Sequence, residues 1–260
     1  MKILFVGDIV GEPGRLVFGR LASLMKARGE VDMIIANAEN AAAGSGITEK
    51  LAREIFAAGC DVMTLGDHVW DKRDVLPYLS SEERVVRPAN FPAEAPGHGA
   101  CVVTTACGVK VGVIALLGRT FMKYLTDCPF HALDREAQKM QAAGIKTVIV
   151  DMHAEATSEK VALGIYADGR VSAVLGTHTH IQTADEQILP GGTAYITDTG
   201  MTGPYDSVIG TQKELILQRY LTGLPNKFEV AKGPGTLCGV LLDIDDVTGK
   251  ARSIVRVQKN

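Results

Sequence analysis

The segment VLGTHTHIQ, residues 174–182, joins an apolar run to two of the six histidines in the chain. Its first residues have the composition of the end of a buried strand, and Gly176 allows the backbone to turn. If the segment is extended, the side chains of His178 and His180 point to the same side. A metal site would explain this pattern, because neutral imidazole is a common metal ligand. A pair of half-buried histidines that are hydrogen-bonded to backbone carbonyls would explain it too. The residues at the other strand ends are needed to distinguish the two explanations.

Strand-like apolar runs alternate with amphipathic segments along the rest of the chain. The predicted strands are residues 2–8, 32–40, 61–68, 146–153 and 171–180, with a hairpin over 100–117 and further strands from about 228, joined by a turn at 246–250. The predicted helices are residues 14–28, 48–59, 133–143 and 158–166. The sequence contains no repeat, low-complexity tract or linker. We therefore expect one α/β domain over residues 1–260, a mixed sheet flanked by helices.

Composition and charge argue against several classes of function. The formal net charge is −3 and no run of Lys and Arg exceeds a pair, so we expect no surface for long nucleic acid. Five scattered cysteines without a C-x-x-C pair favour reduced thiols and a cytoplasmic location. The first residues, MKILFVGD, lead into a strand pattern without the features of a signal peptide. No apolar run approaches the roughly 18 residues of a membrane span, so no membrane partner is expected.

Polar side chains able to bind metals stand at the carboxyl ends of the predicted strands. In open α/β sheets, ligands bind in the crevice outside these ends. Capping or turn formation could explain any one of these residues, but hardly the whole set. The candidates are Asp8, Glu39, Asn40, Asp67, His68, His153, His178 and His180.

Several of these motifs resemble those of the calcineurin-like metallophosphoesterases, in which strand-end residues hold two metal ions between two packed sheets. The motifs are GD at 7–8, GDH at 66–68, His153 and GTHTH at 176–180. Nearly the whole chain is similar to one branch, the YmdB-like phosphodiesterases, through GDIVGEPGR at 7–15, NAEN at 37–40, RPANFP at 87–92, LLGR at 116–119, DMHAEATSEK at 151–160 and TDTGMTGPYDSVIG at 197–210. The resemblance implies mixed β-sheets packed as a sandwich flanked by helices, the calcineurin-like metallophosphoesterase architecture.

The resemblance also implies two divalent or trivalent metal ions as cofactors. A carboxylate has two oxygens and can bridge two ions, which suits Glu39 as a shared ligand. Nitrogen and oxygen ligands without thiolate suit iron, manganese or zinc, and the resemblance favours iron. The implied ligands are Asp8, Glu39, Asn40 and His180 for the first metal, and Glu39, Asp67, His153 and His178 for the second.

Three positions differ from common patterns of the fold or the branch. Ile9 and Val10 follow Asp8, so the D-x-H histidine common in the fold is missing, and Glu39 stands where an aspartate commonly bridges the metals. The YmdB-like branch shares both features. Asp67 stands where that branch usually has asparagine, and its extra negative charge bears on the metal preference and on the acidity of a bound water.

The function implied by the resemblance is hydrolysis of small phosphodiesters, in particular 2′,3′-cyclic nucleotides. A hydroxide that bridges the metals would attack phosphorus, and His68 would protonate the leaving alkoxide as general acid. Arg119 and the loop Thr199–Tyr205 are candidates for substrate contact. Ion pairing and tight turns explain them equally well, and the same holds for Arg87 and Asp151. A homo-oligomer is common among proteins of this size and kind.

Other functional classes fit the sequence less well. The glycines of GDIVGEPGR match neither the dinucleotide-binding motif nor the P-loop motif. Metal-dependent amidohydrolase barrels carry H-x-H at the end of their first strand, where this chain has Asp8. A phosphomonoesterase of the same fold and a non-catalytic, metal-binding regulatory protein remain open. His68 separates a regulatory protein from an enzyme, because a structural metal site has no use for an unligated acid beside it.

Overall fold

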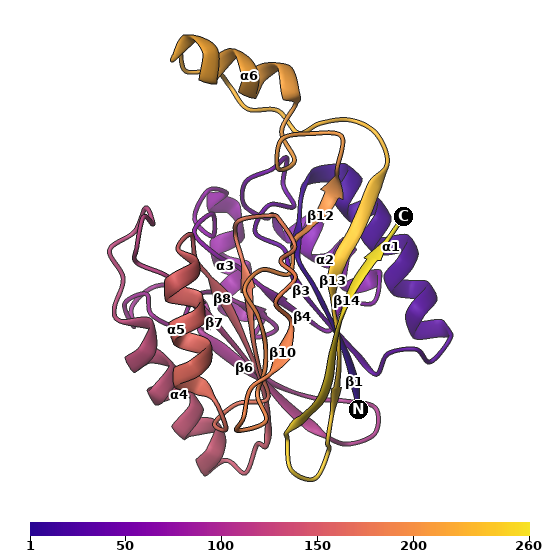
Figure 1. The fold of residues 1–260 in the computed structure, drawn as a ribbon, viewed down its shortest axis with the longest axis vertical. Helices are drawn as coiled ribbons and strands as arrows, with labels where there is room; N and C mark the ends of the chain where they lie inside the picture. The colour runs from indigo at the N-terminus through magenta and orange to yellow at the C-terminus, as the bar shows by residue number, and fades with distance from the viewer.

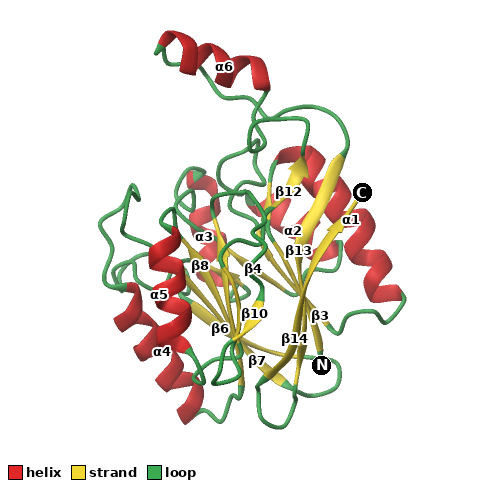
Figure 2. Ribbon diagram, viewed as in Figure 1, coloured by secondary structure: helices red, strands yellow, loops and turns green.

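The computed structural model describes residues 1–260 and contains two β-sheets packed face to face, with helices on both outer faces (Figures 1 and 2). The first sheet has the order β2 (Asp8–Ile9), β12 (Met201–Pro204), β13 (Gly235–Ile244), β1 (Lys2–Val6), β3 (Met33–Asn37), β4 (Val62–Thr64) and β5 (Val85–Val86), and β14 (Ala251–Lys259) pairs with β13. The second sheet has the order β10 (Gln187–Ile188), β11 (Ala194–Ile196), β9 (Ala173–Thr177), β8 (Thr147–His153), β7 (Lys110–Leu117) and β6 (Ala100–Thr104).

Helices cover the outer face of each sheet. The first sheet is covered by α1 (Gly11–Ala27), α2 (Glu49–Ala57), the 3-10 turn η1 (Arg73–Val75) and α3 (Leu76–Ser81). The second is covered by α4 (Pro129–Ala142) and α5 (Thr157–Ala167). Helix α6 (Lys213–Thr222) projects from the body of the molecule (Figure 1).

Alternating side chains explain this layering. In β1, Ile3 and Phe5 pack between the two sheets, whereas Leu4 packs on the side of α1 and α2. In β7, Val113 packs between the sheets and Ile114 packs against α4 and α5. Because both faces of each sheet are covered, the inner strands are apolar along their whole length. The predicted sandwich of mixed sheets flanked by helices is confirmed.

The parallel strands place the site at one edge of the sandwich. Strands β1, β3, β4 and β5 run parallel, and so do β7, β8, β9 and β11. The residues at the carboxyl ends of β3, β4, β8 and β9 lie together, although two of these strands belong to each sheet. Ligands of α/β proteins bind at such an edge.

The predicted first strand, residues 2–8, is interrupted at Gly7. β1 ends at Val6, and Asp8 begins β2, where it pairs in parallel with Met201 of β12. A Cβ atom on Gly7 would overlap the backbone carbonyl of Gly200, so the two segments touch here. Asp8 therefore lies in a short separate strand and not at the end of the first one.

The C-terminal half contains elements that the sequence pattern does not predict. The predicted loop Thr199–Tyr205 is wrong, because β12 occupies Met201–Pro204 and pairs with both β2 and β13. The pattern also does not predict α6, whose only buried residue is Ile216. None of the helices combines the length and apolar character that crossing a membrane requires.

Candidate metal centre

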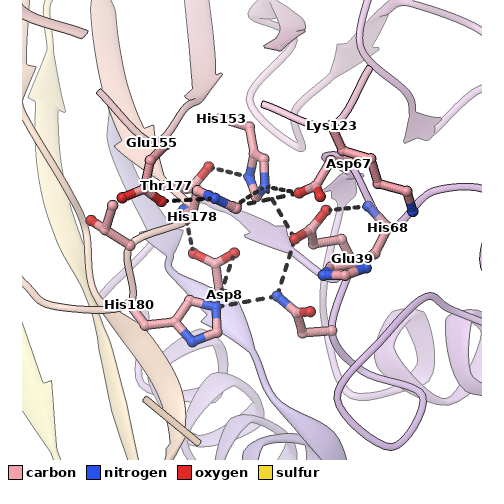
Figure 3. A network of polar contacts seen from close by, with 12 residues as sticks. Asp8, Glu39, Asp67, His68, Lys123, His153, Glu155, Thr177, His178 and His180 are labelled. Atoms are coloured by element: carbon pink, nitrogen blue, oxygen red, sulfur yellow. Dashed lines mark hydrogen bonds and ion pairs between the residues drawn. The ribbon is translucent and has the colours of Figure 1, made fainter. Parts of the chain in front are cut away.

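Turns and strand ends from both sheets bring the predicted site residues together (Figure 3). Most of these side chains follow the carboxyl end of a buried strand, and Asp8 instead begins a short strand. Glu39 and Asn40 follow β3, Asp67 and His68 follow β4, His153 ends β8, His178 and His180 follow β9, and Asp8 begins β2.

One group of ligand atoms surrounds the His153 ring. Its Nε2 lies 3.1 Å from Glu39 Oε1, 3.1 Å from Asp67 Oδ1 and 3.0 Å from His178 Nδ1. Ligand atoms of these four residues all lie within 4.8 Å of one another. A single imidazole N–H can donate only one strong hydrogen bond, so it cannot satisfy three acceptors. A cation among the four groups would satisfy all of them.

A second group lies beside it and shares Glu39. Asn40 Nδ2 lies 3.2 Å from Glu39 Oε1 and 3.3 Å from His180 Nε2. His180 Nε2 lies 3.9 Å from Asp8 Oδ1, and this buried oxygen has no hydrogen-bond partner. A buried carboxylate oxygen without a partner is rare and calls for a cation. The residues of the second group therefore also fit a metal ion.

The charges of the centre support the same conclusion. Asp8, Glu39 and Asp67 are 0%, 1% and 6% exposed. Their only ion-pair partners are histidines, and neither Lys nor Arg reaches them. Buried carboxylates are strongly unfavourable unless they are paired or bind metal. The centre thus has an excess of negative charge that metal ions would neutralise.

Burial and mutual interaction set the protonation of these groups. Burial raises the pKa of Asp8 to about 6. Burial, and then repulsion from His153, lowers the pKa of His178 to about 4, which keeps this imidazole neutral. Burial also opposes charge on His153, but Glu39 and Asp67 outweigh it and raise the pKa of His153 well above its ordinary value. Metal ligands must be deprotonated, so a bound cation would take the place of that proton.

In two of the candidate ligand histidines, the ring nitrogen that points away from the site has a hydrogen-bond partner. His180 Nδ1 donates to the Ile209 carbonyl at 2.9 Å, which leaves Nε2 for the site. His153 Nδ1 lies 2.9 Å from Thr177 Oγ1, which in turn donates to Asp151 Oδ1 at 2.6 Å. Such partners fix the tautomer and the orientation of a metal-binding imidazole. Asp151 therefore has the structural role that its burial suggests.

His178 is held by a carboxylate that the sequence analysis does not single out. Its Nδ1 faces the site, and its Nε2 lies 3.2 Å from Glu155 Oε2 at the protein surface (Figure 3). Glu155 occurs within the string DMHAEATSEK, but nothing in the spacing indicates its partner. It is the outer partner that fixes the His178 tautomer.

His68 belongs to neither ligand group and lies at the edge of the centre. Its backbone N–H donates to Glu39 Oε2 at 3.0 Å, and its Nδ1 lies 2.8 Å from Asp71 Oδ2. Asp71 also accepts a hydrogen bond from the Ser45 hydroxyl and lies 3.6 Å from Lys123 Nζ. Asp71 fixes the proton on Nδ1, so Nε2 is available for chemistry. Its position three residues after His68 is the signal by which it could be found in the sequence.

The backbone that carries His178 and His180 is not extended. β9 ends at Thr177, and the two histidines have positive φ angles of 94° and 64°. The His178 N–H donates to Asp8 Oδ2 at 3.1 Å, and the Thr179 N–H donates to a buried carboxylate that holds the turn, Asp198, also at 3.1 Å. His178 Nδ1 lies 3.0 Å from His153 Nε2, and His180 Nε2 lies 3.3 Å from Asn40 Nδ2. The prediction that strand alternation brings the two imidazoles together is wrong, because the backbone turns at both residues.

A cavity of about 720 Å³ lies over the centre, and Glu39, His68 and His178 line it. Neither Arg119 nor the segment Thr199–Tyr205 lines this cavity. Arg87 is buried and donates to three backbone carbonyls, which is a structural role.

The sequence is similar to known proteins over its whole length. The sequence model of YmdB-like proteins matches residues 4–257. The 2′,3′-cyclic-nucleotide 2′-phosphodiesterase of Bacillus subtilis (strain 168) is 49% identical over 260 residues, which cover 100% of this chain and 97% of that protein. A hypothetical protein from Thermus thermophilus has a similar crystal structure, with a TM-score of 0.92, 41% identity and 100% of both chains covered.

A structure with much lower sequence identity shares the fold. The 5′-nucleotidase precursor from Thermus thermophilus matches with a TM-score of 0.63 at 12% identity, over 100% of this chain and 54% of that one. That likeness concerns the fold alone. The family match and the relatives together show that the chain is an enzyme of the YmdB-like family, with the calcineurin-like metallophosphoesterase fold.

Proposed function

We propose that this enzyme is a phosphodiesterase with a dinuclear metal centre, and that 2′,3′-cyclic nucleotides are its principal substrates among small phosphodiesters. The observation that carries the proposal is a shared carboxylate. Glu39 Oε1 lies 3.1 Å from His153 Nε2 in one ligand group and 3.2 Å from Asn40 Nδ2 in the other. Two ligand groups joined through one carboxylate are suited to a pair of metal ions. The substrate class is the one named for the Bacillus subtilis relative.

The proposed ligands are nitrogen and oxygen atoms only. When bound, the ions would polarise a phosphoryl oxygen and make a water molecule more acidic. We propose iron, and the same ligand types are compatible with manganese or zinc. The first ion would be held by Asp8, Glu39, Asn40 and His180, and the second by Glu39, Asp67, His153 and His178.

His68 supplies the proton for the leaving oxygen in this proposal. Because Asp71 holds Nδ1, the transferable proton is carried on Nε2. The hydrogen bond from the His68 backbone to Glu39 fixes this donor relative to both ligand groups. When a 2′,3′-cyclic ester opens, a ribose oxygen leaves as a poor leaving group and takes this proton.

The test compares three substrates with metal-loaded protein: 2′,3′-cyclic AMP, bis(4-nitrophenyl) phosphate and the monoester 4-nitrophenyl phosphate. We expect both diesters to be hydrolysed faster than the monoester, and a chelator to abolish turnover. Faster hydrolysis of the monoester would identify a phosphomonoesterase of the same fold. Metal binding without turnover of any substrate would identify a regulatory metal-binding protein.

Three broader features belong to the same proposal. Residues 1–260 act as one domain, since Ile3 near one end of the chain and Ile254 near the other pack in the same cluster between the sheets. The location is cytoplasmic, because the five cysteines are free thiols, which suits a reducing compartment. A homo-oligomer is the assembly we propose, because it is common among proteins of this size and kind, and light scattering would check it.

Replacement of Asp67 by asparagine should retain activity. Asp67 Oδ1 lies 3.1 Å from His153 Nε2 and 3.4 Å from His178 Nδ1, and an amide oxygen can take the same place with one negative charge fewer. We expect kcat/KM to stay within about tenfold of the parent, or about 1.4 kcal/mol of barrier, with a shifted metal preference or pH optimum. Metal content and kcat/KM with iron, manganese and zinc measure this. Loss of all metal from a folded variant would show that the site depends on the Asp67 charge.

Glu155→Gln should weaken the second metal site, because Glu155 holds the Nε2 of His178. Loss of such an outer partner typically lowers metal affinity by about 10–100-fold, and we expect the lower end of this range since glutamine can still accept a hydrogen bond. Calorimetric titration of metal-free protein with Mn²⁺ gives the affinity of both sites. The control is Glu159→Gln, the same change at a carboxylate that instead accepts N–H groups of Arg119 and Thr120. An equal loss of metal affinity in the two variants would contradict the role of Glu155 as the partner that holds His178.

A further inference from the structure

The cavity over the metal centre has two chemically different ends. One end is formed by polar site residues such as Glu39, Asn40 and His68, whereas the other includes Arg219, Tyr220 and Phe228. These three residues come from α6 and from the segment that returns from it to the body of the molecule (Figure 1). A volume of about 720 Å³ lies within the range of small-molecule sites. With metal ions bound at the centre, the cavity would suit a ligand that has an anionic group at that end and an aromatic group at the other.

Of the two aromatic residues at this end, Phe228 has the contacts that fix its position. The Arg219 guanidinium carbon lies 4.9 Å from the centre of the ring, a cation–π contact. The residue that follows Phe228 accepts a hydrogen bond from the Gln212 N–H at 3.0 Å, and Val230 bridges to the segment before α6. Tyr220, by contrast, is 81% exposed on the projecting helix.

The Phe228 ring is only partly covered. The residue is 47% exposed although Arg219 lies over one face of the ring. Phe228 lines the cavity, so part of a ring that Arg219 does not cover is available to a ligand there. Arg219 also lines the cavity, and its guanidinium lies over the Phe228 ring.

We propose that the uncovered part of the Phe228 ring, backed by Arg219, stacks against the base of a nucleotide whose phosphodiester lies over the metal centre. This inference rests on the proposed function, since it places the remainder of the same substrate. Every base has an aromatic face, so stacking on such a ring tolerates different bases. The enzyme should thus prefer nucleotides over base-free diesters and discriminate little between adenine and uracil.

The experiment compares 2′,3′-cyclic AMP with a base-free analogue, 1-O-methylribose 2′,3′-cyclic phosphate. Phe228→Ala should lower kcat/KM on the nucleotide by about tenfold, through KM, and leave the analogue unchanged. Phe228→Tyr should keep the parent preference. The matched control is Leu224→Ala, which shortens an apolar side chain that is 61% exposed on the same segment and outside the cavity. An equal loss of kcat/KM on both substrates, or no loss on either, would contradict the proposal that Phe228 stacks against the base.

A binding measurement keeps this inference separate from the proposed function. If the parent enzyme hydrolyses no cyclic nucleotide, the proposed function fails. Calorimetry with AMP and ribose 5-phosphate then tests separately whether Phe228 binds the base. We expect the parent to bind AMP about tenfold more tightly than ribose 5-phosphate, and Phe228→Ala to bind the two ligands equally. Equal binding of both ligands to the parent would refute the role of Phe228.

Discussion

Glu39→Gln is expected to lower kcat/KM on phosphodiesters by about 10³-fold or more, equivalent to about 4 kcal/mol of barrier. Glu39 Oε1 lies between the two ligand groups, and Oε2 accepts the backbone N–H of His68 at 3.0 Å. Glutamine has nearly the same shape but only one acceptor oxygen and no charge. It can serve one ligand group and leaves the other without the shared carboxylate.

Metal content and stability distinguish this loss from unfolding. We expect fewer than two metals per chain by elemental analysis, with a circular dichroism spectrum like that of the parent. The matched control is Glu136→Gln on α4, which neutralises another buried carboxylate, one that pairs with Arg135 and Lys139 far from the centre. That variant should keep both metals and full activity. Full activity of Glu39→Gln with two metals bound would exclude the dinuclear assignment.

His68→Ala should produce the second large effect, one that depends on the leaving group. General acid catalysis typically contributes about 10²–10⁴-fold, or roughly 3–5.5 kcal/mol. A ribose alkoxide needs the proton and should suffer the full loss, whereas a nitrophenolate leaves well without it. Since His68 belongs to neither ligand group, the variant should keep both metals.

The measurement is kcat for 2′,3′-cyclic AMP and for bis(4-nitrophenyl) phosphate, on protein of known metal content. His131→Ala, at an exposed histidine on α4, is the control and should change neither value. Equal losses on both substrates would remove His68 from the acid role. Loss of metal would instead make it a ligand.

Local sequence pattern determined the layered fold and the edge at which the site lies. Each inner strand is a short apolar run bounded by polar or glycine residues, and its alternate side chains enter the clusters on its two faces. Such runs are recognisable without knowledge of their neighbours because both faces of each sheet are buried. These runs end at or just before His153, Asp67 and His178. The sequence pattern therefore predicted that the three residues lie at one edge of the sheets, without predicting their contacts. The quoted motifs then predicted the family, which the comparisons confirm.

Tertiary structure alone decided the path of the chain around the site. The turn at His178 and His180 depends on Asp8, 170 residues away in sequence, and Asp198 holds the residue between them. β12 forms where a loop is predicted because both β2 and β13 offer it hydrogen-bonding partners. Local preferences of about 1 kcal/mol per residue are readily outweighed by such contacts.

The sequence pattern likewise did not predict which groups bond to the ring nitrogens that point away from the site. The pairs His178–Glu155 and His180–Ile209, and the open ring of Phe228 beside Arg219, follow no periodicity that a single strand or helix imposes. A periodic pattern records only whether a face of an element is buried. Which polar atom meets which is fixed when separate elements pack, because each buried donor and acceptor must then find its partner across the chain.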